Sequence, residues 1–199
     1  MNEQTTASAS AEAPASKHSN RKRNALVFGA VALVWLALDV LTKGWVAGNY
    51  VQGEVITEPI LGLVRFHLVH NTGAAWGMFG DSTFLLGVMS LVVCAALVVY
   101  LFALSPKAGV IETVGIALVV AGGLGNVLDR FTLGYVVDFI EPAFIDFPVF
   151  NVADIGVTCG FVIFLIGVVT LWRREDRAAA ELAARAEREG SVDEGPDAR

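Results

Sequence analysis

Carboxylates gather where long apolar stretches of this sequence end. Residues 125–140 read GNVLDRFTLGYVVDFI, which places Asp129, Arg130 and Asp138 beside an apolar run. An ionisable group near the centre of a bilayer costs at least about 2.5–3.5 kcal/mol, so such groups are candidates for function. Two carboxyl groups in one site do not both ionise readily, and one keeps its proton. Such a pair could activate a water molecule with one member and polarise a carbonyl group with the other.

Two further pairs of polar residues are spaced one helical turn apart. Asp39 and Lys43 share one face of a helix, and Asn126 and Arg130 share a face of another. The first pair could simply neutralise itself near the membrane boundary, with Lys43 extending toward water. Arg130 of the second pair could serve only as an anchor at the membrane interface. This explanation is weaker, because two polar groups on one helix face indicate that they bind another polar group.

Asn151 and Asp154 stand at the start of the last apolar stretch, where two interpretations remain open. Asn is a favoured N-cap and an acid in the first turn suits the helix dipole, so capping alone would explain both residues. Asp138 has no comparable explanation, since it lies between Val137 and Phe139 in the sequence.

Asn71 opens the segment NTGAAWG, in which Asn, Thr and Gly73 predict a turn. Ala74 and Ala75 would permit close approach of the backbone. A plain loop is an equal alternative.

Missing motifs exclude several chemistries. The only histidines are His18, His67 and His70, so the HExxH motif of metalloproteases is not present. The sequence has no GxSxG serine motif, and GGLGN lacks the lysine and the strand-to-helix context of a phosphate-binding loop. What remains is carboxylate chemistry, from Asp39, Asp129, Asp138 and Asp154.

The elements that must position these residues are four apolar stretches. The chain has 199 residues, of which 55% are hydrophobic, and its mean hydropathy is +0.61. A transmembrane helix needs about 20 mostly apolar residues. The stretches are residues 24–46, 83–104, 109–128 and about 152–172. The sequence therefore predicts a polytopic membrane protein with an all-α core.

Basic residues flank the predicted spans on one side. They precede the first span at residues 21–23, separate the second from the third at Lys107, and follow the fourth at 173–177. Short segments rich in Lys and Arg stay in the cytoplasm, so both termini are predicted to be cytoplasmic.

The two ends of the chain are predicted to lie outside the four-span domain. Residues 1–23 are predicted to form a disordered cytoplasmic tail, because most of them are small or polar with no apolar periodicity. Residues 173–199 form a second cytoplasmic tail, whose first part REDRAAAELAARAEREG favours a helix that continues the fourth span. The domain itself then comprises residues 24–172.

Two segments lie on the opposite side of the membrane from the tails. Residues 50–71 are rich in Val, Ile, Leu and Phe and are broken at Gly53 and Pro59, which predicts short strands joined by turns. Residues 131–151 contain YVVDFI and FIDFPVF. We expect the two segments to form a small, partly apolar platform at the membrane surface.

Five short motifs follow one another along this chain. They are DVLTK (39–43), NTGAA (71–75), GGLGNVLDR (122–130), VVDF (136–139) and FNVAD (150–154). In their order and spacing they resemble the lipoprotein signal peptidases, or signal peptidases II, of bacteria. The resemblance covers about residues 24–172. One departure is Trp76, because the family commonly has Phe after NTGAA.

The resemblance implies a fold of four transmembrane helices with a small extracytoplasmic β-cradle and an interfacial helix. It implies an aspartic endopeptidase that removes signal peptides from diacylglyceryl-modified prolipoproteins by cleaving before the lipidated cysteine. By the motif match, the catalytic aspartates are Asp138 and Asp154. The positions that line or support the substrate site are Asp39, Lys43, Asn71, Gly73, Asn126, Asp129, Arg130 and Asn151.

The partners implied by the resemblance are prolipoprotein substrates, the lipid bilayer and the inhibitor globomycin, without metal, cofactor or nucleic acid. We expect a monomer in the bacterial cytoplasmic membrane, with its active site at the outer face.

Two other classes of protein fit some of these residues. A small transporter could line a pathway with Asp39, Lys43 and Arg130. However, the polar residues lie at one boundary rather than at the midplane, and no inverted repeat is visible. A structural subunit would not need paired acids outside the spans. The sequence favours the peptidase.

Overall fold

Long apolar helices dominate the fold. The computed structural model describes residues 15–73, 82–105 and 107–193, with side chains for 21–73, 82–105 and 107–185. The helices are α1 (Ala15–Asn49), α2 (Thr83–Val99), α3 (Val110–Thr132) and α4 (Val152–Asp193), and α2 continues into the π-helical turn η2 (Tyr100–Leu104). In this part of the chain four helices are long and apolar enough to cross a membrane, which confirms the four predicted spans.

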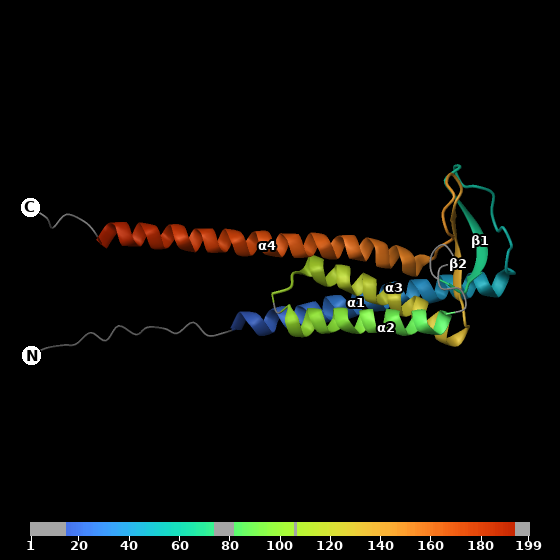
Figure 1. Ribbon diagram of the computed structural model, residues 1–199, viewed down its shortest axis with the longest axis horizontal. Coiled ribbons are helices and arrows are strands. Elements are labelled where there is room, and N and C mark those ends of the chain that lie inside the picture. The colour runs from blue at the N-terminus through green and yellow to red at the C-terminus, as the bar shows by residue number, and fades with distance from the viewer. Residues whose placement is uncertain (1–14, 74–81, 106, 194–199) are drawn as a thin grey trace, which may run out of the picture.

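The first and last helices, α1 and α4, are longer than the predicted spans. Residues 15–23 are helical where the sequence predicts disorder, because α1 begins at Ala15, directly after Pro14, and basic residues and alanine favour a helix. α4 continues past residue 172 to Asp193, as its charged, alanine-rich sequence predicts. The first turn of α1 and the last turn of α4 lie at the end of the bundle away from the sheet (Figure 1).

α3 is the central helix of the bundle. Of its most apolar 18-residue stretch, 56% is buried within the protein, compared with 6% of the corresponding stretch of α1. α3 also packs against each of the other three helices. Most large apolar side chains of α1 and α2 instead face outward, where lipid would cover them. The charged residues that α3 carries at its end therefore lie between helices rather than in lipid.

Glycines allow α3 and α4 to approach one another closely. A Cβ atom on Gly160 of α4 would lie 2.7 Å from the carbonyl oxygen of Gly115 on α3. A Cβ atom on Gly122 would collide with the carbonyl oxygen of Ala153, in the first turn of α4. The GGLG run of α3 thus serves helix packing, as small residues do between transmembrane helices.

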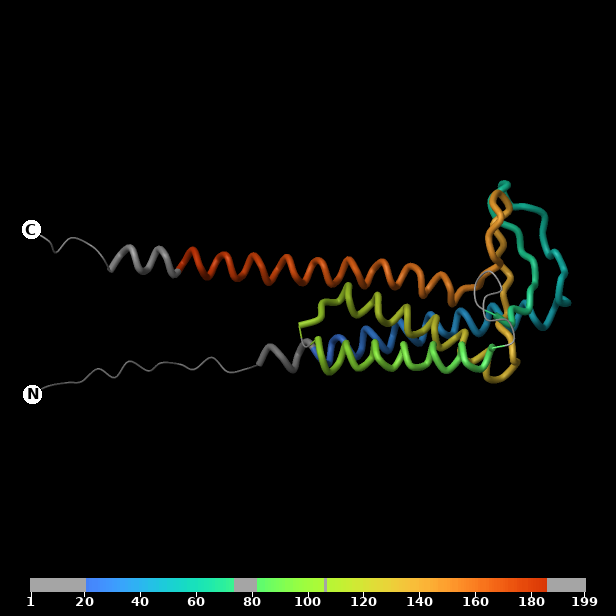
Figure 2. The backbone as a smooth tube through the Cα atoms, viewed as in Figure 1, coloured from blue at the N-terminus to red at the C-terminus, as the bar shows by residue number. Residues whose placement is uncertain are grey.

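A two-stranded antiparallel sheet lies across one end of the bundle, opposite the first turn of α1 and the last turn of α4 (Figure 1). Its strands are β1 (Val64–Asn71) and β2 (Val136–Pro142), which confirms strands in both predicted exterior segments. Residues 50–63 lead from α1 around the sheet to β1, and residues 143–151 lead from β2 to α4 (Figure 2). Leu68, Val137 and Phe139 pack the sheet onto α1 near Val46.

A β-bulge sets which side chains of the sheet share a face. Phe66 pairs with Ile140, but Val69 pairs with Asp138, so two residues of β1 stand opposite one residue of β2. Successive strand residues point to opposite faces, and the extra residue therefore changes which ones share the face of Asp138. With the bulge, Asn71 lies on that face; an unbroken register would have put His70 there instead.

The interfacial helix implied by the resemblance is not among the described elements. Outside the four spans the described residues form strands, turns and extended chain. Trp76, the departure from the family pattern, lies outside the described residues.

The close α3–α4 contact gives a first testable prediction. Gly160→Ala should destabilise the protein by about 1–3 kcal/mol, because the added methyl group forces the two helices apart. Gly29→Ala is the matched control, since a Cβ atom at Gly29 meets nothing within 4 Å. The measurement is the thermal unfolding temperature of each variant in detergent. Equal unfolding temperatures for both variants would contradict the packing role of Gly160.

Candidate active site

A single cavity brings most of the predicted site residues together. It has a volume of about 470 Å³ and lies where α3, α4 and the sheet meet. It is lined by Asn71, Asn126, Arg130, Val136, Asp138, Phe147, Pro148, Val149, Phe150, Asp154, Ile155, Thr158 and Cys159. The cavity therefore has two carboxyl groups, three other polar side chains that the sequence predicts, and an apolar wall.

Asp138 projects from β2 and is held by two side-chain amides. Its Oδ1 accepts a hydrogen bond from Nδ2 of Asn151 (2.7 Å), and its Oδ2 accepts one from Nδ2 of Asn71 (2.8 Å). Asp138 is 2% exposed, so these bonds replace those that water would make. The amide of Asn71 reaches Asp138 only because the β-bulge places both side chains on one face.

Asp154 lies in the first turn of α4 and takes part in a reciprocal cap. Its backbone N–H donates to Oδ1 of Asn151 (3.0 Å), and its Oδ2 accepts the backbone N–H of Asn151 (3.0 Å). These two bonds make a capping box and confirm the capping interpretation. Its Oδ1 accepts a third bond from Nδ2 of Asn126 (2.8 Å), and Asp154 also lines the cavity. Capping and a place in the site are thus compatible.

The orientation of each asparagine amide is determined by what its oxygen accepts. Oδ1 of Asn71 accepts the backbone N–H of Gly73 (3.0 Å), and Oδ1 of Asn151 accepts that of Asp154. Oδ1 of Asn126 accepts a bond from the ammonium of Lys43 (2.9 Å). Because these three groups are donors only, each amide must turn its nitrogen toward a carboxylate.

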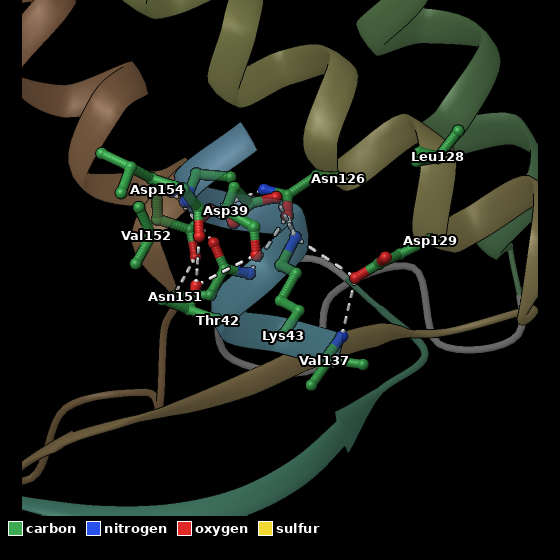
Figure 3. A network of polar contacts seen from close by, with 12 residues as sticks. Asp39, Thr42, Lys43, Asn126, Leu128, Asp129, Val137, Asn151, Val152 and Asp154 are labelled. Atoms are coloured by element: carbon green, nitrogen blue, oxygen red, sulfur yellow. Dashed lines mark hydrogen bonds and ion pairs between the residues drawn. The ribbon is translucent and has the colours of Figure 1, made fainter. Parts of the chain in front are cut away.

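The ammonium of Lys43 lies between two carboxylates and an amide (Figure 3). Its Nζ is 2.9 Å from Oδ2 of Asp39, 3.2 Å from Oδ2 of Asp129 and 2.9 Å from Oδ1 of Asn126. The predicted pairing of Asp39 with Lys43 is confirmed. The alternative that Lys43 extends toward water is wrong, because Lys43 is only 3% exposed and its charge is satisfied within the protein.

Asp39 and Asp129 connect this ammonium to the backbone of other elements. Oδ1 of Asp39 accepts the backbone N–H of Ala153 (2.8 Å), which is one of the free donors at the start of α4. Oδ2 of Asp129 accepts the backbone N–H of Val137 in β2 (3.1 Å). A side chain at Gly125 would collide with Oδ2 of Asp39, so this glycine is required for the approach of α1 to α3.

Arg130 borders the cavity from the last turn of α3. Its guanidinium donates to the backbone oxygens of Asn126 (3.3 Å) and Gly73 (3.4 Å), and its Nε has no hydrogen-bond partner in the described structure. Asn126 and Arg130 therefore both have polar partners, Asp154 and the Gly73 carbonyl, as two polar residues on one helix face predict. The guanidinium as a whole borders the cavity.

Electrostatics favours one proton in this group of side chains. Four carboxyl groups (Asp39, Asp129, Asp138, Asp154) are near two cations (Lys43, Arg130). Burial, followed by the negative charge of Asp154, raises the pKa of Asp138 from 3.8 to about 7. The hydrogen bonds from Asn71 and Asn151 oppose this shift without cancelling it. With a pKa of about 7, Asp138 carries a proton in a large fraction of molecules at neutral pH.

All ten residues that the sequence assigns to the site belong to this connected group. The sequence did not identify the apolar wall, which comprises Val136, residues 147–150, Ile155, Thr158 and Cys159. Its signals were the segment FIDFPVF and the spacing of Ile155, Thr158 and Cys159 after Asp154. Among the described residues, no three His, Cys, Asp or Glu side chains come together in a way that could hold a metal ion.

The polar site lies where α3 ends, α4 begins and β2 runs between them in the chain, rather than halfway along the helices. This is the end of the bundle that carries the sheet (Figure 1). Carriers bind their cargo near the midplane, between half-helices. The fold and the site therefore define a polytopic membrane enzyme.

Comparisons with known proteins agree with this class. Residues 31–170 match the family model described as signal peptidase (SPase) II. The lipoprotein signal peptidase of Latilactobacillus sakei subsp. sakei (strain 23K) is 36% identical over 146 residues, which are 72% of this chain and 94% of the relative. That of Streptococcus pyogenes serotype M1 is 35% identical over 156 residues, which are 78% and 97% of the two chains.

Two solved structures, both described as a bacterial membrane enzyme structure determined by the in meso method, have similar folds. The one at 2.3 Å resolution has a TM-score of 0.65 and 29% identity, with 72% of this chain and 87% of that chain covered. The one at 1.9 Å has a TM-score of 0.63 and 30% identity, with 71% and 91% covered. The chain belongs to the signal peptidase II family and is a membrane protease.

The pKa of Asp138 predicts a pH-dependent stability. A carboxyl group whose pKa is raised on folding contributes its full stabilisation below its unfolded value of 3.8 and loses it as the pH rises through about 7. Asn does not titrate, so the unfolding temperature of Asp138→Asn relative to the unmodified protein should rise between about pH 5 and pH 8. The expected rise is about 2–4 °C for each kcal/mol gained.

Thermal melts of both proteins across this range are the measurement. Asp146→Asn is the control, because Asp146 is exposed and its replacement should change the melt little. A difference between Asp138→Asn and the unmodified protein that stays constant with pH would contradict the raised pKa.

Proposed function

We propose that this chain is an aspartic endopeptidase that removes signal peptides from prolipoproteins, with Asp138 and Asp154 as its catalytic residues. The observation that carries the proposal is the geometry of the two carboxyl groups. All four of their oxygens accept hydrogen bonds from N–H groups, and both side chains face one cavity at the end of the spans. The substrate class follows from the relatives, which are named lipoprotein signal peptidases.

The two carboxyl groups have different roles in the proposed reaction. Asp154 lies at a helix N-terminus, where the helix dipole and two N–H donors favour negative charge, so it acts as the base. Asp138 has a pKa of about 7 and acts as the acid. Asp154 takes a proton from a water molecule, whose oxygen attacks the scissile carbonyl carbon. Asp138 gives its proton to the carbonyl oxygen.

The resulting tetrahedral intermediate carries two hydroxyl groups and collapses with the roles reversed. The C–N bond breaks, and the leaving amine takes the proton that Asp154 had accepted. Asp138 recovers a proton from one hydroxyl group as the new carboxylic acid forms. Both side chains thereby return to their starting states. Arg130 borders the same cavity, and its guanidinium is suited to bind a backbone carbonyl of the extended substrate.

The apolar wall of the cavity supports a lipid-modified substrate. Phe147, Val149, Phe150 and Ile155 border the cavity beside the carboxyl groups, and Cys159 continues the wall along α4. This surface is suited to the acyl chains of a diacylglyceryl group, which would place the bond before the lipidated cysteine at the two carboxyl groups. The same wall is suited to the apolar part of globomycin, which we expect to inhibit the enzyme.

We further propose that the site faces the outside of the cytoplasmic membrane, that both termini are cytoplasmic and that the protein acts as a monomer. The basic residues at 21–23, Lys107 and 173–177 lie where the apolar stretches end away from the cavity, and such residues remain on the cytoplasmic side. The alternative, a transporter, is not favoured, because the polar residues do not line a path along the bundle.

Replacement of either catalytic aspartate should abolish cleavage. Asp138→Asn and Asp154→Asn should each lower the rate by about 10²–10⁴-fold or more, because each removes one proton-transfer group. The double variant should be little worse, since residues that act as a unit are not additive. Folding should survive, because Asn has nearly the shape of Asp and caps α4 equally well at position 154.

The assay is cleavage of a diacylglyceryl-modified prolipoprotein by each purified variant, together with a thermal melt to show folding. Asp146→Asn is the matched control on the exposed loop beside the cavity and should retain activity. Substantial turnover by a well-folded Asp138→Asn or Asp154→Asn protein would exclude the aspartic mechanism.

Arg130→Lys should lower kcat/KM although the charge is kept. The guanidinium donates to two backbone oxygens at once, whereas a lysine is a point charge that cannot match this geometry. We expect a loss of roughly tenfold or more, a difference of about 1.4 kcal/mol. The kinetics of the same cleavage assay measure it, and equal kcat/KM values would reduce Arg130 to an interfacial anchor.

A further inference from the structure

Lys43 is a buried cation that lies next to the active site without being part of the cavity wall. The residue is 3% exposed, and it is not among the residues that border the cavity. A direct contact between its ammonium and a substrate in that cavity is therefore not supported. Any effect of Lys43 on the reaction must pass through a residue that does border the cavity.

Asn126 is that residue. Its Oδ1 accepts bonds from the ammonium of Lys43 (2.9 Å) and from Nδ2 of Asn151 (3.0 Å), while its Nδ2 donates to Oδ1 of Asp154 (2.8 Å). An ammonium has three donors and no acceptor, so the nitrogen of Asn126 cannot face Lys43. Figure 3 shows this order of contacts from Lys43 through Asn126 to Asp154.

We propose that Lys43 is a positioning residue, which fixes the amide of Asn126 with its nitrogen toward Asp154 and so keeps the carboxyl group of Asp154 oriented as the base. The proposal rests on the aspartic mechanism proposed above. Asp39 and Asp129 have a supporting role, since they hold the ammonium at 2.9 and 3.2 Å and compensate its charge.

Without the ammonium, Oδ1 of Asn126 keeps one donor, Nδ2 of Asn151 (3.0 Å), instead of two, so the amide turns over more readily. An amide oxygen would then face the carboxylate of Asp154, an arrangement that is favourable only if Asp154 is protonated. A protonated Asp154 cannot act as the base, so activity would fail at low pH sooner than in the unmodified enzyme. The charged groups around Asp154 from the other elements are Arg130 of α3 and Asp138 of β2.

Two substitutions of Lys43 separate the effect of its donor from that of its charge. Lys43→Met has similar length and neither donor nor charge, whereas Lys43→Gln keeps an N–H donor for Asn126 without the charge. For Lys43→Met we expect the acid limb of the kcat pH profile to move to higher pH by about one unit, with kcat about tenfold lower on that limb. KM should change little, since Lys43 does not border the cavity. For Lys43→Gln the acid limb should stay near its original pH.

A third substitution tests the same step with Lys43 in place. Asn126→Asp keeps an oxygen for Lys43 but presents a second oxygen to Asp154 instead of a donor. It should move the acid limb in the same direction as Lys43→Met, and it remains informative if Lys43→Met fails to fold. Thr42→Ala is the control in the same turn of α1, because the Thr42 hydroxyl bonds back to the Leu38 carbonyl of its own helix (2.7 Å). It should leave kcat and the profile unchanged.

The measurement is kcat and KM for a diacylglyceryl-modified prolipoprotein as a function of pH, with a thermal melt of each variant. Identical acid limbs for Lys43→Met and Lys43→Gln, or an unmoved limb for Asn126→Asp, would overturn the positioning role. These outcomes differ from the outcome expected if the proposed function itself is wrong. A wrong proposed function would appear as turnover by Asp138→Asn or Asp154→Asn, whereas the positioning role alone fails if both of these are inactive and the limbs do not move.

Discussion

An ammonium group enclosed within an apolar bundle must find its counter-charges inside the protein, and this constraint organises the end of the bundle that carries the site. Lys43 of α1 meets Asp39 on its own helix and Asp129 and Asn126 on α3. Leaving one buried partner unpaired costs several kcal/mol, so the contacts form together or not at all. Asp39 then continues to the first turn of α4, and Asp129 continues to β2. The same charge thus fixes three helices and one strand relative to one another.

Close packing of α3 on α4 makes these contacts possible. Glycines at 115, 122 and 160 allow the two backbones to approach, and Gly125 leaves room for the carboxylate of Asp39. Small residues are the usual means by which helices associate in lipid, where the hydrophobic effect does not drive helices together. At this end of the bundle they bring short polar side chains within hydrogen-bond distance. The two carboxyl groups proposed to be catalytic can therefore be rigidly held at this end of the bundle.

Much of the fold and many site residues could be predicted because their signals are local. A run of about 20 apolar residues is sufficient for a span, and its four occurrences gave the four helices. The pairing of Asp39 with Lys43 follows from a spacing of one helical turn, and the cap formed by Asn151 and Asp154 follows from their position at a helix start. The start of α1 was misplaced because the sequence around residues 15–23 is polar yet compatible with a helix.

The arrangement that turns these residues into a site depended on contacts between segments far apart in the chain. The β-bulge between Phe66 and Val69 decides that Asn71 shares a face with Asp138, and no local pattern in β1 indicates it. The spacing of Asp39 and Lys43 left open whether the ammonium points to water, and the packing of α1 on α3 buries it instead. The orientation of Asn126 likewise depends on a donor 83 residues away. The sequence by itself determined which residue types lie at the membrane boundary, because periodicity and capping are properties of neighbouring residues. Only the tertiary structure determined which of them face one another, because strand register and amide orientation are set by partners from other elements.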